Sequence, residues 1–585
     1  MADEGAVGGG LAGAYAGPPA LAAYLGASAL LTAADASRRG SERAGMDVPL
    51  KEIRHAGGAR PDLIPAVAAR RHPHLTHRDA AETAWAARML TDGAFFASHV
   101  DEDDLALPDA RPCALSEEDD AMLLRTGVAV PCPRSVRRRV VSRAYKVLKS
   151  DGCTSRLILP CVALNRATSQ PASFRIAAPR EVARWLRRAG AAASADGTNW
   201  FYQFALPDEV RRLFAYRMGP SPRLMAVLVM GHTQSPRIAH SLMCALAGAT
   251  PLAVASDLAV HPAMVIIDNV LVAGLSRRMM DRRLRAFREA CADSSAVVTL
   301  DGDPSVRAVT HGGVRYALRP LRWHLKPGWA ERFAAMAAPA LSTVSTWGWW
   351  RSAIGSAVWA CRVLEVPLAV LVPVWRRLRP HARADDPGSP VTLDDGARRA
   401  WSSFVQRVRT DPWVRITRRR PFRVWLWADA SNTGAGWVWY HPVSGWSQGR
   451  IAWTAAEAAG AAKRMPWAEA RATRAAARAL IRSSLPLLRA CVIIVTDCLP
   501  WFHALRSGSP RSSWLAEEYL RLADDLSAGR VQYRPAWCDT RCMLADGPSR
   551  GRRWSSQHPI PYPTRMSRDH LPFAAPCAPP TAGWR

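Results

Sequence analysis

The sequence predicts an α/β (α+β) protein of several domains, and three observations support this. Short apolar runs rich in β-branched residues, typical of strands, occur at 263–267, 422–428 and 491–495. Other segments repeat their apolar residues at helical spacing, for example between Asp79 and Leu90. The length of 585 residues corresponds to about three or four domains.

The charge balance indicates the class of partner. The chain has 78 Lys and Arg against 49 Asp and Glu, a net charge of +29, with an isoelectric point near 10.7. A surface this positive favours nucleic acid. No basic amphipathic helix of the kind that binds anionic membranes is visible, so we expect no membrane partner.

The cysteines and the N-terminal segment indicate the compartment. The 12 cysteines show no metal-ligand or disulfide spacing, which predicts reduced thiols in the cytoplasm or nucleus and not a secreted protein. The uncharged stretch 5–34 lacks a basic start and contains Gly and Pro, so it does not fit a signal peptide. The runs 137–139 and 418–420 are all Arg and fit either an import signal or a phosphate-facing surface.

Composition changes divide the chain. Residues 1–78 are largely of low complexity and predict a largely disordered leader. A Pro-, Asp- and Gly-rich stretch at 379–390 predicts a linker. Residues 551–585 are basic and rich in Pro without periodicity, which predicts a disordered tail.

A hairpin signal carries the first candidate site. The apolar runs 263–267 and 270–273 are separated by Asp268 and Asn269, residues that tolerate the backbone of a tight turn. We therefore expect these two side chains at the tip of a turn. Read alone, the pair is simply a polar turn.

Upstream segments add to this hairpin. In order along the chain stand two basic residues, an Asp before an aromatic run, and a Met-Gly pair after an apolar strand: Lys149, Arg156, Asp196, Phe201, Met230 and Gly231. The series resembles, in order and spacing, the fingers and palm of a reverse transcriptase. The resemblance implies that Asp196 and Asp268 carry metal ions. It also implies five nucleotide-binding residues: Lys149, Arg156, Phe201, Met230 and Gly231.

The chemistry explains these residue types. Nucleotide addition is an in-line phosphoryl transfer that two divalent cations assist, and oxygen ligands favour Mg²⁺. The family has a second Asp where this chain has Asn269. An amide oxygen is a poorer ligand than a carboxylate, so both retained and lost polymerase activity stay open.

A second set of carboxylates lies near the C-terminus. Asp429 ends the run 422–428, and Asp497 follows the run 491–495. Glu469 lies on the apolar face of a segment rich in helix formers, and Asp546 begins a Gly-Pro turn. Four acidic groups gathered together need cations to offset their repulsion.

This second set resembles ribonuclease H over residues 422–550. The resemblance implies that Asp429, Glu469, Asp497 and Asp546 are the four metal ligands of a two-metal hydrolytic site. Glu457 is the alternative helix carboxylate, and helical placement favours Glu469.

Together the two resemblances have the order of retrotransposon polymerases, and the closing motif at 545–550 is most similar to the tyrosine-recombinase (DIRS and VIPER-like) group. They imply a right-hand fingers-palm-thumb polymerase fold, a connection and a ribonuclease H-like mixed-sheet domain. The implied domains are N-terminal helices, fingers and palm at 79–275, thumb and connection at 276–421, and ribonuclease H at 422–550.

The implied function is RNA-directed DNA polymerase with ribonuclease H activity, using two Mg²⁺ ions per site with Mn²⁺ as a second candidate ion. Its partners would be an RNA template, a DNA primer, the RNA-DNA hybrid and deoxynucleoside triphosphates. The alternative is a decayed or domesticated relative that binds RNA or hybrids, with ribonuclease H activity only or with no catalysis.

Overall fold

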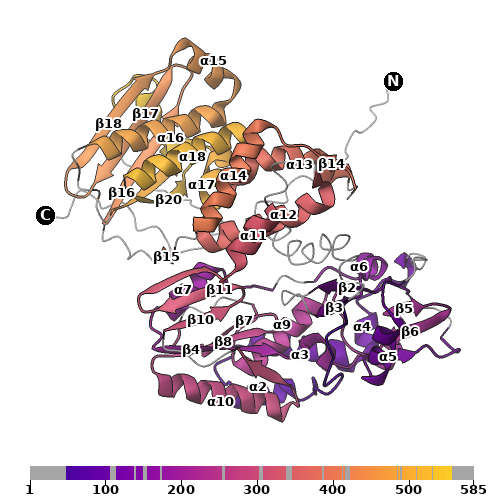
Figure 1. The fold of residues 1–585 in the computed structure, drawn as a ribbon. Helices are drawn as coiled ribbons and strands as arrows, with labels where there is room; N and C mark the ends of the chain where they lie inside the picture. The colour runs from indigo at the N-terminus through magenta and orange to yellow at the C-terminus, as the bar shows by residue number, and fades with distance from the viewer. Residues whose placement is uncertain are drawn as a thin grey trace, which may run out of the picture.

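The computed structural model is a helix-and-sheet protein, which confirms the predicted α/β fold class. Figure 1 shows two stacked bodies, the lower one indigo to magenta and the upper one red to yellow. The structure describes residues 48–105, 113–136, 140–148, 154–171, 174–252, 257–301, 307–337, 345–384, 386, 388–410, 413–415, 422–483, 485, 487, 490–508, 510, 512–529 and 531–555. Among them, no helix is long and apolar enough to span a membrane.

The first part of the chain consists mainly of short helices and two small sheets. Its elements are α2 (Ile64–Arg71), α3 (His77–Thr91), α4 (Gly93–Ala97), η1 (Glu102–Asp104), α5 (Glu117–Arg125), β1 (Ala129–Pro131), β2 (Tyr145–Leu148), β3 (Ser155–Ile158), α6 (Val162–Ala167), α7 (Pro179–Leu186), η2 (Trp200–Gln203), α8 (Asp208–Arg211), β5 (Ala215–Met218) and β6 (Ser221–Met225).

The expected disordered leader at 1–78 is wrong for its last third. Helix α2 buries Ile64 and Val67 in the core, and α3 begins at His77. The Thr76 hydroxyl accepts from the Asp79 amide while the Asp79 carboxylate accepts from the Thr76 amide, a capping box that fixes the start of α3. Residues 1–47, the Arg run 137–139 and the tail from 556 lie outside the described residues.

A four-stranded antiparallel sheet forms the centre of the lower body. Its strands, in the order β7-β8-β4-β9, are β4 (Ala191–Gly197), β7 (Ala263–Ile266), β8 (Asn269–Gly274) and β9 (Val298–Leu300). Helices α9 (Ser235–Ala247) and α10 (Arg277–Asp293) pack on one face. The other face joins the core of the following segment. Because both faces are buried, β4 is composed mostly of alanine.

A second sheet and a helical layer follow. The sheet has the order β10-β11-β12-β15, with β10 (Ala308–His311), β11 (Val314–Leu318), β12 (Leu321–Leu325) and β15 (Val414–Arg415). The other elements are α11 (Trp329–Ala337), β13 (Ser345–Thr346), α12 (Trp347–Leu364), η4 (Leu368–Leu371), α13 (Val372–Ala384), β14 (Pro390–Val391) and α14 (Asp395–Thr410).

The expected linker at 379–390 is partly helical. Helix α13 continues through Pro380 to Ala384. Val374 and Leu378 are fully buried in the preceding turns, and this burial stabilises the helix although Pro380 removes one backbone donor. The irregular part of the expected linker is therefore shorter than its composition suggests. The Arg run 418–420, a separate prediction, lies outside the described residues.

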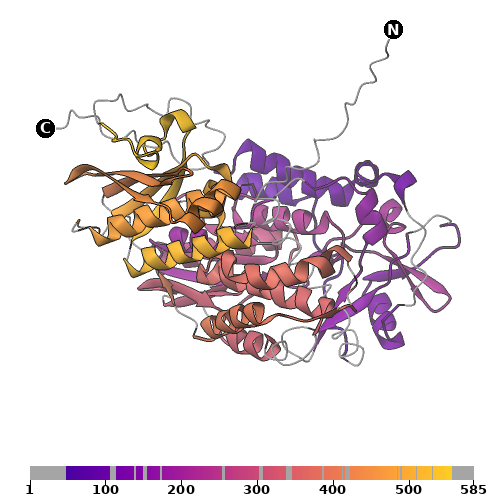
Figure 2. The same ribbon diagram turned by 90° about the horizontal axis from the view of Figure 1, so that it is seen from above.

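The last sheet has the order β18-β17-β16-β19-β20, in which β16, β19 and β20 run parallel. Its strands are β16 (Phe422–Ala430), β17 (Gly434–His441), β18 (Gly445–Ala452), β19 (Ala490–Thr496) and β20 (Gln532–Trp537). The accompanying helices are α15 (Ala455–Lys463), α16 (Met465–Arg482), α17 (Leu499–Ser507), α18 (Ser513–Ala528), η5 (Thr540–Cys542) and α19 (Asp546–Ser549). Figure 2 shows α16 and α18 side by side along one face of this mixed sheet.

Candidate active sites

The hairpin of the central sheet has its turn one residue earlier than the sequence predicts. Ile266 pairs with Asn269, so the two turn residues are Ile267 and Asp268, and Asn269 is the first residue of β8. Ile267 has a φ of 57°, which is strained for a β-branched residue. The Ile267 amide donates to Nδ1 of buried His240 at 3.2 Å, a contact that holds this turn.

Register brings the predicted palm residues together. Asp196, at the end of β4, is the direct cross-strand neighbour of Asn269. Burial, followed by the charges of Asp268 and Asp301, raises the pKa of Asp196 to about 7. A bound cation would offset the repulsion among these carboxylates and would favour their ionised forms.

Asn269 does not point freely into solvent. Its Nδ2 donates to Oδ2 of Asp301 at 3.1 Å and to the Ala195 carbonyl at 3.3 Å. Its Oδ1 accepts from the Gly312 amide at 3.2 Å, in the turn between β10 and β11. The amide oxygen expected as a weaker metal ligand is thus already used to join the two sheets.

Asp301 is a functional candidate that sequence reasoning missed. It immediately follows β9, its amide donates to the Ser194 carbonyl at 2.9 Å, and its carboxylate faces Asn269. The sequence contained a signal, since Asp301 ends the apolar run 296–300 as Asp429 ends its own strand. The run 296–300 does not show which other strand β9 pairs with.

The predicted nucleotide-binding residues lie around this sheet. Arg156 is exposed on β3. Its positive charge partly counteracts the rise in the pKa of Asp196. Phe201 is half-buried in η2. Lys149 falls outside the described residues.

Met230 and Gly231 form a tight turn against the β3 segment. Gly231 has a φ of 127°, and a Cβ there would lie 2.0 Å from the Leu159 carbonyl oxygen. The Met230 carbonyl accepts from the Leu159 amide at 3.0 Å. The Asn165 side chain holds the turn by donating to the Gly231 carbonyl and accepting from the Thr233 amide. Only glycine fits this approach.

The second carboxylate set converges at the last sheet. Ligand oxygens of Asp429 on β16, Glu469 on α16 and Asp497 after β19 lie within 4.8 Å of one another. The Ala430 amide donates to Oε1 of Glu469 at 3.3 Å. Oε2 of Glu469 is buried without a hydrogen-bond partner among the described residues. A buried, unpartnered carboxylate oxygen between two other acids fits a divalent cation.

Electrostatics agree with that fit. Burial, together with the charges of Asp497 and Asp546, raises the pKa of Asp429 to about 6. Burial and then the charges of Asp429 and Asp497 raise the pKa of Glu469 well above its usual range. Bound cations would lower the pKa values of Asp429 and Glu469 again, because they neutralise the negative charge of the cluster.

Asp546 is not in this group of three acids, although its charge contributes to the raised pKa of Asp429. It begins α19, where Arg550 pairs with it at 2.8 Å, and it is more exposed than the buried Asp429 and Glu469. Helix α19 packs directly on β17 because Gly436 has no side chain: a Cβ would lie 2.1 Å from the Ser549 amide. The Ser431 hydroxyl also donates to the Ser549 carbonyl at 2.7 Å.

The alternative helix carboxylate has a different place. Glu457 caps α15, where it accepts from the Thr454 amide, and it pairs with Arg471. It is absent from the carboxylate cluster, whereas Glu469 is one of its three members. His503 lies half-buried on α17 and has a ring contact with Phe502.

No family model and no curated protein matches the sequence. Among solved structures, the foamy viral protease-reverse transcriptase in complex with RNA/DNA hybrid is 12% identical with a TM-score of 0.44, over 80% of this chain and 62% of that chain. The dRH form of the foamy viral enzyme in complex with double-stranded DNA is 13% identical with a TM-score of 0.40, over 81% of each chain. Similarities at this level assign no activity to this chain.

Proposed function

We propose that the chain is an RNA-directed DNA polymerase with ribonuclease H activity, acting on an RNA template, a DNA primer and their hybrid. The observation that carries the proposal is the buried cluster of Asp429, Glu469 and Asp497, with its unpartnered Glu469 oxygen. The net charge of +29 suits nucleic acid, and the chain's own sheet order supports a ribonuclease H-like domain at 422–550.

In the proposed nuclease site, Asp429, Glu469 and Asp497 would hold two Mg²⁺ or Mn²⁺ ions, with Asp546 closing the site. Such ions activate water and stabilise the leaving oxygen of an in-line displacement. The Ala430 amide holds Oε1 of Glu469, and Oε2 has no hydrogen-bond partner among the described residues. One oxygen of Glu469 lies within 4.8 Å of oxygens of Asp429 and Asp497. The nearby Arg550 places positive charge where the scissile phosphate would approach.

In the proposed polymerase site, Asp196 and Asp268 would hold the ions, and Asp301 would supply the charge that Asn269 lacks. The Asn269 amide is neutral, but its donation to Asp301 places a full carboxylate beside it. Arg156, Lys149, Phe201, Met230 and Gly231 would bind the incoming deoxynucleoside triphosphate. The implied domains at 79–275 and 276–421, the DIRS and VIPER-like assignment and a cytoplasmic or nuclear location belong to the same proposal.

A second candidate function is hybrid cleavage without synthesis. Asn269 favours it, because its oxygen is committed to Gly312. In that case the central sheet would only bind nucleic acid.

Two assays with two variants separate these functions. We expect Asp497→Asn to abolish cleavage of RNA in a hybrid while primer extension continues, and Asp268→Asn to do the reverse. Parent protein that cleaves hybrids but does not extend a primer would favour the second candidate. Cleavage and extension by both variants at the parent's rates would refute both assignments.

A further inference from the structure

Helix α10 carries an uncompensated stripe of arginines. Arg278, Arg282, Arg285 and Arg288 are all exposed, and spacings of four, three and three residues put them on one side of the helix. None of the four has an ion pair or hydrogen bond among the described residues. At about 1.5 Å per residue the stripe is about 15 Å long.

The acids of α10 cannot neutralise this stripe. Asp281 pairs with Arg277, and Glu289 and Asp293 pair with Arg71. Arg283 turns inward and donates to the Leu258 and Ala273 carbonyls. On the exposed surface of α10, the positive charge that no acid pairs with therefore comes from the four arginines of the stripe.

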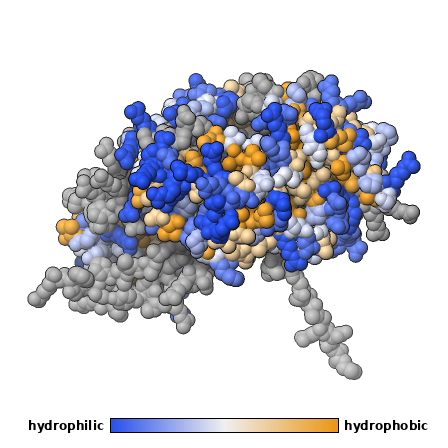
Figure 3. Space-filling view, turned by 90° about the horizontal axis from the view of Figure 1, so that it is seen from below, coloured by the Kyte–Doolittle hydropathy of each residue, from blue (hydrophilic) through white to orange (hydrophobic). Residues whose placement is uncertain are grey.

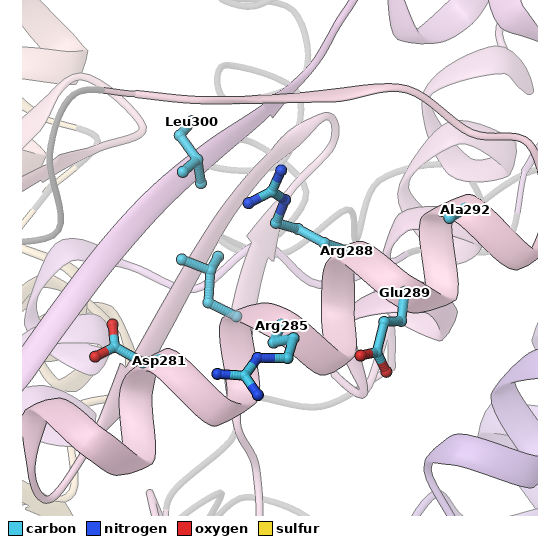
Figure 4. A pocket seen from close by; sticks show the side chains of 7 residues that line it. Asp281, Arg285, Arg288, Glu289, Ala292 and Leu300 are labelled. Carbon is cyan, nitrogen blue, oxygen red and sulfur yellow. The ribbon is translucent and has the colours of Figure 1, made fainter.

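A hollow of about 550 Å³ lies beside the stripe. Arg285 and Arg288 line it together with the apolar residues Leu284, Ala292 and Leu300. The acids Asp281 and Glu289 also line it, and they are paired with Arg277 and Arg71. In Figure 4, Arg288 reaches from α10 toward the strand that carries Leu300. In Figure 3, seen from below, strongly hydrophilic side chains surround smaller apolar patches on this side of the molecule.

The hollow lies behind the candidate polymerase site. Leu300 pairs with Ala195, which is buried in the core together with Leu284 and Phe287 of α10. Successive side chains of a strand point to opposite faces, so Asp196 points away from α10. A nucleic-acid strand bound at the hollow would therefore contact a different surface from one that reaches Asp196.

We propose that the arginine stripe and the hollow bind single-stranded nucleic acid outside both candidate active sites. The arginines would contact successive phosphates, and the apolar floor with two guanidinium groups would receive an unpaired base. A duplex fits less well, because its bases are stacked inside and cannot enter the hollow. The proposal does not depend on either catalytic activity.

The test is the salt dependence of binding, in EDTA, of fluorescent 15-nucleotide oligo(U) and oligo(dT) to the full chain. We expect Arg282→Gln/Arg285→Gln/Arg288→Gln to reduce the slope of log K against log salt by about 2, and to weaken binding at least about tenfold near 0.1 M salt, since each phosphate contact on a single strand contributes about 0.7. The two oligonucleotides show whether RNA or DNA is the preferred source of the strand.

A matched control removes the same charge elsewhere. Arg54, Arg60 and Arg521 are exposed and each is paired with a neighbouring acid. We expect Arg54→Gln/Arg60→Gln/Arg521→Gln to keep most of the parent's slope. An equal loss of slope in both triple variants would overturn the proposal, as would a parent-like slope in the stripe variant with parent-like thermal unfolding.

Discussion

At the scale of single residues, the most informative pair is Asn269 and Asp301. The sequence predicted a missing carboxylate at position 269, and the structure has another carboxylate hydrogen-bonded to that amide at 3.1 Å. A carboxylate therefore lies beside position 269, and it comes from the residue that follows β9.

Exchanging the two residues tests this account. Asp301→Asn should reduce primer extension about 10- to 100-fold, in the range typical of changes beside metal ligands. Asn269→Asp/Asp301→Asn should recover most of the loss, because the hydrogen bond persists with donor and acceptor exchanged. Single-turnover primer extension measures both, and a double variant as slow as Asp301→Asn would show that Asp301 has another role.

The raised pKa of Asp429 makes a stability prediction for the cation-free protein. The carboxyl ionises at about pH 4 when unfolded and at about pH 6 when folded, so the protonated form favours folding. Stability is thus lost as pH rises through this window, and the loss is complete above about pH 6. In EDTA at pH 8, Asp429→Asn should be more stable than the parent by about 2–3 kcal/mol, with the difference vanishing below about pH 4.

Urea unfolding at the two pH values measures this difference. Asp524→Asn is the control, because Asp524 is exposed on α18. Equal stabilisation by both variants at pH 8 would mean that total charge, and not the buried cluster, is responsible.

At the scale of elements, close packing of α19 on β17 positions Asp546. Gly436→Ala should displace α19, because its Cβ would lie 2.1 Å from the Ser549 amide. We expect a loss of about 1–3 kcal/mol in stability, as for other overpacked positions, and at least a tenfold loss of hybrid cleavage. Gly396→Ala, whose Cβ meets only Asp394 at 3.4 Å, is the control.

Element type was more predictable than element boundaries. The strands ending near Asp429 and Asp497 have long β-branched or aromatic runs, and such runs specify a buried strand. The turn at Ile267 and Asp268 could not be predicted, since Asn and Asp are the usual residues at positive φ and here Ile267 adopts it. The helical part of the expected linker depends on the burial of Val374 and Leu378, a tertiary contact that composition does not contain.

At the scale of the whole molecule, two carboxylate sites lie on two separate sheets of one basic chain. The grouping of Asp429, Glu469 and Asp497 was expected because each ends or faces a strongly patterned segment, and their oxygens lie within 4.8 Å of one another. Asp546 begins α19 and is not in this group, and the metal-ligand role of all four acids stays a prediction. Asp301, Gly312 and His240 could not be predicted, because their roles come from contacts between residues 27 or more positions apart in the sequence. Local periodicity predicts the type of an element, but it does not show which distant strands pair.

The central claim is that the buried cluster at the last sheet hydrolyses RNA in a hybrid with the help of divalent cations. The most direct test is Mg²⁺-dependent cleavage of a labelled RNA-DNA hybrid by the parent chain and by Glu469→Gln, which keeps the shape of the side chain but removes its charge. We predict Mg²⁺-dependent cleavage by the parent and a loss of at least about 100-fold in the variant. Equal cleavage by the two proteins, or none by a folded parent in Mg²⁺ or Mn²⁺, would contradict the account.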